Sequence, residues 1–330
     1  TAFSAVSAEA VTVVDTGTNR RTNAVGFRVE KSVAVGRGPT GIAVNPHSQL
    51  GIVVNGLESN ASVFDLVTGI VRSTISLQAS SSPAGVTINP FNNVAVITLA
   101  ARNQAAVVDL ITASQISTIN VGSDPRGVAL NPITNVAVVT NAGANTVSVI
   151  QLGTGQVATI GDGIQVAPSA VAINTVTNQA VVVNNGSSSV SVIDLAASPP
   201  AVIGTPIPLA PASDPRAVAI DETTNTAYVA QFATNNIAQI DLATRTLTGI
   251  LPGGKDPIAL AFNPNTKELF ISQAGLNRVA VLDLTQAPPS FVDFVLTGAG
   301  PQGVAVDLFT DLVVVANHDA NSVTFSRPLH

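Results

Sequence analysis

A proline returns at nearly constant spacing along most of the 330-residue chain. The intervals between successive copies are 44, 42, 43, 47, 42 and 44 residues. A repeat of this length is typical of chains that stack small supersecondary units or close them into a ring, so it restricts the possible folds strongly. The recurring prolines are Pro39, Pro83, Pro125, Pro168, Pro215, Pro257 and Pro301.

Four short apolar runs follow each proline. The first three read GIAVN at 41–45, GIVVN at 51–55 and SVFDL at 62–66, and a fourth, weaker run resembles SQISTINVG at 114–122. These runs are rich in Val and Ile and are bounded by Gly, Pro, Asn or Asp, as β-strands are. None shows the 3.6-residue period of a helix. The first run alternates small with branched side chains, which fits strands crowded around a central axis.

Four strands per unit in seven units predict an all-β, seven-bladed β-propeller with four antiparallel strands per blade, forming one domain over residues 1–330. The last repeat holds only three strands, and residues 28–36 match the fourth-strand pattern. We therefore predict that 28–36 closes the ring and removes the open sheet edges. Residues 11–15 and 322–325 both resemble a third strand of that last blade, and only one of them can occupy it. The predicted repeats start near residues 37, 81, 123, 166, 213, 255 and 299.

The composition excludes several functions. Charged residues make up 10% of the chain, aromatic residues 4%, and the net charge is −6, so we expect no nucleic-acid binding and no general attraction to anionic membranes. The chain has no Cys, which excludes disulfides and thiolate metal sites. No run approaches the roughly 18 apolar residues of a membrane-spanning helix.

Two repeats carry a recognisable motif. Residues 138–150 read VVTNAGANTVSVI, residues 181–194 contain VVVN and SVSVID, and the junction at 122–127 reads GSDPRG. Over about residues 28–326 the chain resembles the YVTN-repeat β-propellers, although its one tyrosine is Tyr228. The resemblance implies a prokaryotic protein that is exported to the periplasm, the cell surface or the extracellular space. It implies no particular activity.

Several polar residues recur in register and are therefore expected to be architectural. An aspartate ends the third strand of most repeats, and an Asn or Asp ends the first. Side chains at such positions accept hydrogen bonds from the N–H groups of the following turn. The third-strand residues are Asp65, Asp109, Asp194, Asp241 and Asp283, and the first-strand residues are Asn45, Asn89, Asn131, Asp221, Asn263 and Asp307.

Function is sought where the repeat is broken. In the propellers that this chain resembles, the loops from fourth to first strand and from second to third strand share one face, at the mouth of the central channel. Arginines among the non-consensus residues of these loops could bind an anion or a carboxylate, because the guanidinium fork matches such groups. Alternatively, Arg126 and Arg216 pair with neighbouring aspartates. The candidate residues are Glu58, Arg102, Arg126, Arg216, Gln231, Gln273, Arg278, His318 and Asp319, with Arg37, Lys255 and Gln302 in the same loops.

The sequence offers little for catalysis. Of its three histidines only His318 falls in the candidate loops, so a metal site of paired histidines is not expected, and neither is a cofactor. Because Asp319 is adjacent in sequence to His318, we expect a solvated loop histidine instead of an oriented base. An enzyme alternative remains open: a lactonase-like hydrolase or streptogramin-lyase-like enzyme could use His318, Glu58 and either Arg126 or Arg216.

These observations favour a non-enzymatic binding or scaffold propeller that recognises a small anionic ligand, a glycan or a protein on the channel-mouth face. We expect a monomer. A second alternative is a structural cell-surface module of a larger protein.

Overall fold

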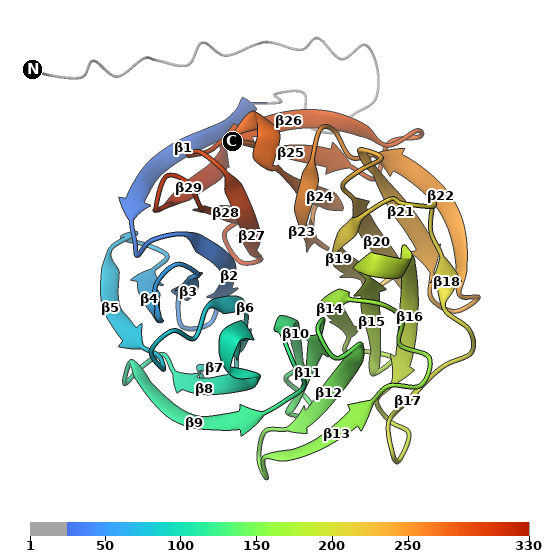
Figure 1. Ribbon diagram of the computed structural model, residues 1–330. Helices are drawn as coiled ribbons and strands as arrows, with labels where there is room; N and C mark the ends of the chain where they lie inside the picture. The colour runs from blue at the N-terminus through green and yellow to red at the C-terminus, as the bar shows by residue number, and fades with distance from the viewer. Residues whose placement is uncertain (1–24, 330) are drawn as a thin grey trace, which may run out of the picture.

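A computed structural model describes residues 25–329 of the chain. Seven antiparallel sheets stand around a common central axis, with the first strand of each sheet innermost (Figure 1). This confirms the seven-bladed propeller with four strands per blade, except that blade 4 has two short strands at its outer edge. Among the described residues the helical elements are three 3-10 turns, and no helix is long and apolar enough to cross a membrane. These turns are η1 (Ala100–Arg102), η2 (Asn185–Ser187) and η3 (Ala274–Leu276).

The strands of blades 1–6 follow chain order from the axis outward. Blade 1 contains β2 (Pro39–Asn45), β3 (Leu50–Asn55), β4 (Asn60–Asp65) and β5 (Val71–Ser76); blade 2 contains β6 (Pro83–Asn89), β7 (Val94–Leu99), β8 (Gln104–Asp109) and β9 (Ser114–Asn120); blade 3 contains β10 (Pro125–Asn131), β11 (Val136–Asn141), β12 (Thr146–Gln151) and β13 (Gln156–Ile160). Blade 4 contains β14 (Pro168–Asn174), β15 (Gln179–Asn184), β16 (Ser189–Asp194), β17 (Ala201–Val202) and β18 (Ile207–Pro208); blade 5 contains β19 (Pro215–Asp221), β20 (Thr226–Gln231), β21 (Asn236–Asp241) and β22 (Thr246–Pro252); blade 6 contains β23 (Pro257–Asn263), β24 (Glu268–Gln273), β25 (Arg278–Asp283) and β26 (Ser290–Leu296).

Blade 7 joins the two ends of the described chain. It contains β27 (Pro301–Asp307), β28 (Leu312–Asn317) and β29 (Ser322–Leu329), and β1 (Val25–Ala34) pairs antiparallel with β29 as its outermost strand (Figure 1). The predicted closing strand is therefore confirmed, at 25–34 instead of 28–36. Of the two segments that resemble a third strand, 322–325 occupies that place in β29, whereas 11–15 lies outside the described residues.

Each innermost strand begins at the recurring proline, where the missing N–H group removes no bond from the ladder. A register shift follows the proline, and small residues come next. A Cβ atom added at Gly41 would lie 2.7 Å from the carbonyl oxygen of Ala84 in blade 2, and one added at Gly127 would lie 2.8 Å from that of Ser169 in blade 4. The predicted crowding therefore exists, and it is a close approach between innermost strands of neighbouring blades.

The hydrophobic core lies between blades. Every residue of β3, β11, β20 and β28 is buried, because both faces of a middle strand are covered by neighbouring sheets. Ile52 and Val54 of blade 1, for example, pack against Ala95 and Ile97 of blade 2. The closing blade joins in the same way, with the Phe64 and Phe325 rings edge to face at 5.5 Å. Each interface therefore buries a mainly Val and Ile layer, and the closed ring leaves no blade with an uncovered face.

The recurring aspartates and asparagines cap turns, as predicted. Asp65 Oδ1 accepts hydrogen bonds from the backbone N–H groups of Val67 and Thr68, and Asp109 and Asp241 do the same in their own turns. Asn45 Oδ1 accepts from the N–H of His47 in the turn between the first two strands. These turns, with those between third and fourth strands, form one end of the propeller, which we call the turn face. The loops at the other end form the mouth face.

The first-strand Asn and Asp residues also join neighbouring blades, which the sequence did not predict. Asn45 Nδ2 donates to Asn93 Oδ1 of blade 2 at 2.8 Å, and Asn131 Nδ2 donates to Asn178 Oδ1 of blade 4 at 2.8 Å. Each partner is the last residue of the next blade's turn and has positive φ, a conformation that Asn tolerates well. The seven contacts close a circle on the turn face: Asn45–Asn93, Asn89–Asn135, Asn131–Asn178, Asn174–Asn225, Asp221–Lys267, Asn263–Asp311 and Asp307–Gln49.

Candidate functional site

The two loop types predicted to share the mouth face do meet there. In blade 1 the N–H of Gly56, in the loop after the second strand, donates to the carbonyl oxygen of Gly38, in the loop before the first strand, at 2.7 Å. Blade 3 repeats the contact between Ala142 and Asp124 at 3.0 Å. The candidate residues therefore do lie at one end of the molecule, but the prediction that all of them are in loops is wrong. Glu58, His318 and Asp319 lie in loops and Arg102 ends η1, whereas five candidates lie at strand ends, namely Arg126 in β10, Arg216 in β19, Gln231 in β20, Gln273 in β24 and Arg278 in β25.

Arg126 and Arg216 each bind the aspartate two residues earlier. Arg126 Nε lies 2.8 Å from Asp124 Oδ1, and Arg216 Nη2 lies 2.6 Å from Asp214 Oδ2. The Arg216 guanidinium also lies 3.5 Å from the ring centroid of Phe232. The hydrogen bond from Arg216, with a further one from Asn185, holds the pKa of Asp214 below its usual value although burial opposes this. Of the two interpretations of these arginines, the local ion pair is present, and the anion-binding role stays a prediction.

Arg102 and Arg278 are also engaged locally. Arg102 Nε donates to the carbonyl oxygen of Ala79 at 3.1 Å. Arg278 Nε donates to Gln273 Oε1 at 2.7 Å, and its guanidinium lies 3.8 Å from the ring centroid of Phe294. These contacts hold each guanidinium against its own part of the fold. The arginines belong to blades 2, 3, 5 and 6, so they do not come from one or two adjacent loops.

Gln231 and Gln273 are fully buried and face their own blades. Gln231 Nε2 donates to Asn236 Oδ1 at 2.7 Å, and Gln273 Nε2 donates to the carbonyl oxygen of Gly253 at 3.1 Å. Gln231 thus bonds to the start of the next strand, and Gln273 bonds to the loop that precedes its own blade. Either side chain would have to break its hydrogen bond before it could contact a ligand.

The same position, at the end of the second strand, carries a buried asparagine in four other blades, which sequence reasoning did not single out. Asn141 Nδ2 donates to the hydroxyl oxygens of Thr146 and Ser148, both at 3.0 Å. A Cβ atom added at Gly122 would lie 2.6 Å from Asn141 Cγ, so the preceding loop needs glycine. The signal was present in the repeat, as the last letter of VVTN and VVVN. The four asparagines are Asn55, Asn141, Asn184 and Asn317.

His318 and Asp319 form a hydrogen bond, which corrects one sequence expectation. His318 Nδ1 lies 2.8 Å from Asp319 Oδ1, and the two side chains are 29% and 66% exposed. The two residues begin the turn that joins β28 to β29 within blade 7. Glu58 is occupied separately, since its Oε2 accepts from Asn60 Nδ2 at 3.0 Å.

The residues named for a hydrolase or lyase do not form one cluster. His318 belongs to blade 7, Glu58 to blade 1, Arg126 to blade 3 and Arg216 to blade 5. Within residues 25–329 no hydrogen bond or ion pair connects His318 to Glu58 or to either arginine. The same part of the chain contains no group of three or more His, Asp or Glu side chains that could hold a metal ion.

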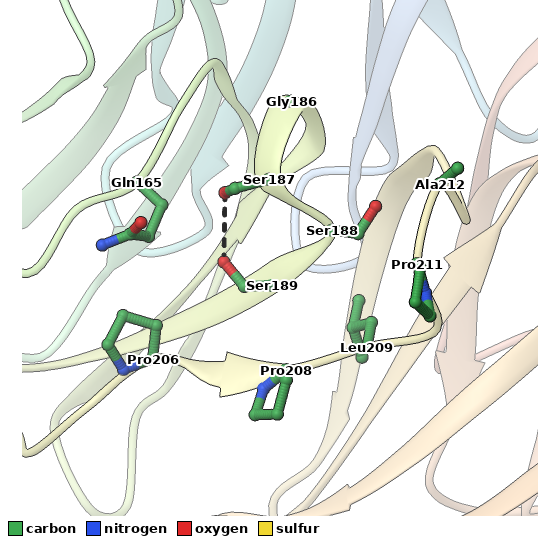
Figure 2. A pocket seen from close by; sticks show the side chains of 10 residues that line it. All are labelled: Gln165, Gly186, Ser187, Ser188, Ser189, Pro206, Pro208, Leu209, Pro211 and Ala212. Carbon is green, nitrogen blue, oxygen red and sulfur yellow. Dashed lines mark hydrogen bonds between the residues drawn. The ribbon is translucent and has the colours of Figure 1, made fainter.

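A hollow of about 640 Å³ opens on the mouth face beside blade 4 (Figure 2). Gln165 borders it from the loop before β14, Ser188 from the loop after β15, and Leu209 from the segment after β18. No charged side chain lines it. The other lining residues are Gly186, Ser187, Ser189, Pro206, Pro208, Pro211 and Ala212.

The hollow exists because the outer edge of blade 4 departs from the repeat. Between Pro168 and Pro215 the repeat is 47 residues long, and the segment 195–213 holds five prolines. Proline cannot donate to a ladder, so a continuous fourth strand is interrupted and only Ala201–Val202 and Ile207–Pro208 pair with β16. The candidate residues predicted from the sequence were charged or polar residues in the loops where the repeat is broken. This proline-rich segment was therefore not among them.

The border of the hollow is held by polar contacts. Ser189 Oγ accepts from Asn184 Nδ2 at 3.2 Å and lies 3.2 Å from Ser187 Oγ, the pair drawn in Figure 2. Asn185 Nδ2 donates to Asp214 Oδ1 at 2.5 Å, which ties the loop of blade 4 to the Asp214–Arg216 pair of blade 5. A second hollow of about 500 Å³ lies away from this site, between the outer strand of blade 2 and the β12–β13 turn of blade 3.

Comparison with known proteins supports the fold. No protein-family model matches the chain, and no curated protein matches its sequence. Among solved structures, a streptogramin B lyase superposes with a TM-score of 0.76 at 12% identity, over 92% of this chain and 98% of that one. Virginiamycin B lyase from Staphylococcus aureus gives 0.74 at 15% identity over 92% and 100%, and a chain of hydrazine synthase from Kuenenia stuttgartiensis gives 0.72 at 22% identity over 88% and 95%. At these identities the similarity establishes the seven-bladed fold alone.

Proposed function

We propose that the protein is a non-enzymatic binding propeller and that the hollow beside blade 4 takes a short, neutral, polyhydroxylated ligand such as a glycan. The observation that carries this proposal is the coincidence of the longest, proline-rich repeat with an uncharged hollow on the mouth face. Its volume of about 640 Å³ lies within the range of small-molecule sites.

The lining suits such a ligand chemically. Serine hydroxyls and the amide of Gln165 can donate and accept hydrogen bonds, which matches sugar hydroxyl groups. The Pro206, Pro208 and Leu209 side chains supply apolar surface for the C–H faces of a sugar ring. Few rotatable side chains line the hollow, so little conformational entropy is lost when a ligand orders them.

The charge distribution favours the neutral ligand over the anion. Each of Arg126 and Arg216 is already balanced by a carboxylate within 3 Å, which reduces the field available to a second anion. We therefore retain the glycan and set aside the small anion as the first choice of ligand.

We infer in addition that the chain is a member of the YVTN-repeat propellers and is exported in a prokaryote. The motifs at 138–150 and 181–194 support this assignment, and the closed ring with its Asn-rich loops is compatible with it. Detection of the chain in the periplasmic, surface or culture-medium fraction of its source would support export, and a cytoplasmic location would contradict it.

The binding proposal is tested with an array of neutral and acidic oligosaccharides, followed by calorimetry on any hit. Gln165→Ala with Ser188→Val should weaken binding of a neutral glycan at least about tenfold, because hydrogen bonds in the hollow are lost. The matched control is Ser123→Val, an exposed serine in a mouth-face loop of blade 3. Binding of acidic ligands alone, abolished by Arg126→Ala and Arg216→Ala, would contradict the proposal and support the anion site instead.

One observation supports an enzyme as the second candidate. His318 is oriented by Asp319 and could act as a base, on a fold shared with two lyases. A screen of ester, lactone and lyase substrates tests this candidate, with His318→Ala as the control. Turnover that disappears in His318→Ala would replace the binding proposal.

A further inference from the structure

The outermost strand of each blade presents an open sheet edge at the rim of the propeller (Figure 1). A row of unpaired N–H and C=O groups pairs readily with another strand, and proteins prevent this with charged side chains, prolines or interrupted strands. Five of the seven blades here are protected in this way. The protecting residues are Arg28, Glu30 and Lys31 in β1, Arg72 in β5, Pro252 in β22, Asp293 in β26, and the prolines that interrupt blade 4 around β17 and β18.

Blades 2 and 3 lack this protection. Their outermost strands, β9 and β13, contain neither a charged residue nor a proline. Within residues 25–329, β9 pairs with β8 alone and β13 pairs with β12 alone, so the outer edge of each strand is open. The two unprotected edges belong to adjacent blades, so they form one continuous part of the rim.

The second hollow, of about 500 Å³, lies in this part of the rim. Four residues of β9, Ser117–Asn120, line one side of it, and the β12–β13 turn lines the other together with Val157 of β13. No charged side chain lines this hollow. The unprotected edge of blade 2 therefore faces a space that is open to solvent and electrically neutral.

Two glycines in the β12–β13 turn keep the hollow open. A Cβ atom added at Gly155 would have no atom within 4 Å, and one added at Gly153 would have Asn135 Nδ2 as its nearest neighbour, at 4.0 Å. The position of Gly153 holds Val67 in blade 1 and Ile111 in blade 2. Blade 3 thus has glycine where these blades place a large side chain, and the space beside β9 stays unfilled.

We propose that this hollow is a docking site for an extended, uncharged segment of another protein, which adds to β9 as a fifth strand of blade 2. The open edge of β9 selects a polypeptide in extended conformation, because its spaced donors and acceptors match those of a second strand. The neutral lining selects an uncharged segment, because a charge placed there would lose hydration without gaining a partner.

The geometry of β9 and of the hollow favours a single strand over the edge of a second copy. Residues Ser117–Asn120 follow the register shift at Ile116 and pair regularly with β8, so this half of β9 provides the regular ladder that a partner strand needs. A volume of about 500 Å³ holds a few residues of one strand. Edge-to-edge contact with a second copy would bring a whole blade to the rim and would make no use of the hollow.

This inference goes beyond the proposed function, because the two hollows border different blades and take different ligands. The glycan-site variant Gln165→Ala with Ser188→Val should leave peptide binding at β9 unchanged. Failure of the glycan proposal would therefore not affect this one, and each proposal can fail while the other stands.

A phage-displayed library of random twelve-residue peptides, selected on the full chain, tests the proposal. The enriched peptides should be uncharged and should alternate β-branched with polar residues, because such sequences favour an extended strand. Fluorescence anisotropy of the synthesised peptides then compares their affinity for the parent chain and for variants. Selection of no peptide, or of charged peptides alone, would overturn the proposal.

Ile116→Arg is the variant that protects the edge of β9. Blade 1 carries Arg72 at the same register shift, where it pairs with Asp65, and Asp109 occupies the place of Asp65 in blade 2. The variant should therefore fold, and it should weaken peptide binding at least about tenfold. Thr248→Arg is the matched control, because Thr248 is exposed at the same register shift in blade 5; it should leave the affinity unchanged.

A second variant and a modified peptide test the contact from both sides. Val157 is 37% exposed on the opposite side of the hollow, and Val157→Arg should also weaken binding at least about tenfold. N-methylation of alternate peptide residues should abolish binding in one of the two possible registers and leave it in the other, because a strand offers one of its edges to β9. Hydrogen exchange of the amides in 114–120 should slow when the peptide binds.

Three results would overturn the proposal at this stage. The first is an affinity that neither Ile116→Arg nor Val157→Arg changes, and the second is binding that tolerates N-methylation in both registers. The third is a chain that self-associates, loses this property in Ile116→Arg and selects no peptide, which would identify a second copy as the partner of β9.

Discussion

Lys267 Nζ lies 3.2 Å from Oδ2 of Asp221, and the two residues come from neighbouring blades. At the four interfaces from blade 1 to blade 5 the same position holds a pair of asparagines. One ion pair thus replaces an amide pair in an otherwise repeated contact. Both residues of this pair differ from the asparagines of those four interfaces, and they still contact each other, so the contact between blades is kept with different side chains.

The Asp221–Lys267 pair gives a first prediction. The Asp221 side chain is only 4% exposed, so Lys267→Met should leave a buried carboxylate without its cation and reduce the free energy of unfolding by about 1–3 kcal/mol. The double variant Asp221→Asn with Lys267→Asn rebuilds the amide pair of the other interfaces and should recover most of that loss. Urea denaturation of the three proteins measures this. A double variant less stable than Lys267→Met would contradict the interpretation.

Stability should fall in acid because three aspartates are held ionised. Burial raises the pKa of Asp221, but hydrogen bonds from Thr223 and Lys267 outweigh this effect and hold the pKa below 3.8. Burial also raises the pKa of Asp65, and hydrogen bonds from Thr68 and Arg72 lower it below the same value. A lowered native pKa stabilises the fold above the unfolded value near 3.8, and this contribution is lost as pH falls through the native pKa.

The third aspartate, Asp214, allows this pH dependence to be tested, because the hydrogen bond from Arg216 is the largest influence on its pKa and lowers it. Asp214→Asn should be less stable than the parent at pH 7, and the difference should shrink at pH 3. Chemical denaturation at both pH values tests this. A difference that is constant with pH would show that the carboxylate charge contributes nothing.

The close approach of innermost strands predicts the effect of adding a methyl group. Gly127→Ala would place its Cβ 2.8 Å from the Ser169 carbonyl oxygen, against backbone that cannot move without shifting a blade. We expect a loss of about 1–3 kcal/mol in the free energy of unfolding. Gly153→Ala is the matched control, because the nearest atom to its added Cβ is 4.0 Å away. Equal stability of the two variants in thermal denaturation would disprove the crowding argument.

The buried asparagine at the end of the second strand predicts a coupled pair. Blade 2 carries Leu99 and Ala106 where blade 3 carries Asn141 and Ser148, so the protein contains both solutions. Asn141→Leu alone should cost about 1–3 kcal/mol by leaving the Ser148 hydroxyl buried without its donor. Adding Ser148→Ala should restore part of the stability. A double-mutant cycle with no coupling energy would contradict this.

The sequence predicted the strands, the turns and the closure of the ring well. These features depend on chemistry within one repeat: the proline that starts the first strand, the alternation of small and branched residues, and the Asx residues whose side chains reach N–H groups two positions later. The closing strand could be found because the last repeat lacked one strand and residues 28–36 had no other place in the pattern.

The candidate site was predicted less well. The end of the propeller at which Arg126, Arg216 and His318 lie follows from the repeat, although the two arginines are the second residues of strands β10 and β19 and not loop residues. Their partners do not follow, because a guanidinium or imidazole reaches whichever acceptor the folded loop presents, and here each reaches its own neighbour. The hollow beside blade 4 was missed because its lining comes from three separate segments of the chain, at residue 165, at 186–189 and at 206–212.

The sequence by itself determined the number of blades, the order of the strands and the residues that turn the chain, since each of these is decided by contacts within about 43 residues. Only the tertiary structure decided which side chains meet across blades: the circle that includes Asp221 and Lys267, and the hollow at Ser188. The physical reason is that the rotation between successive sheets brings together positions far apart in the chain, and no pattern within one repeat encodes that rotation.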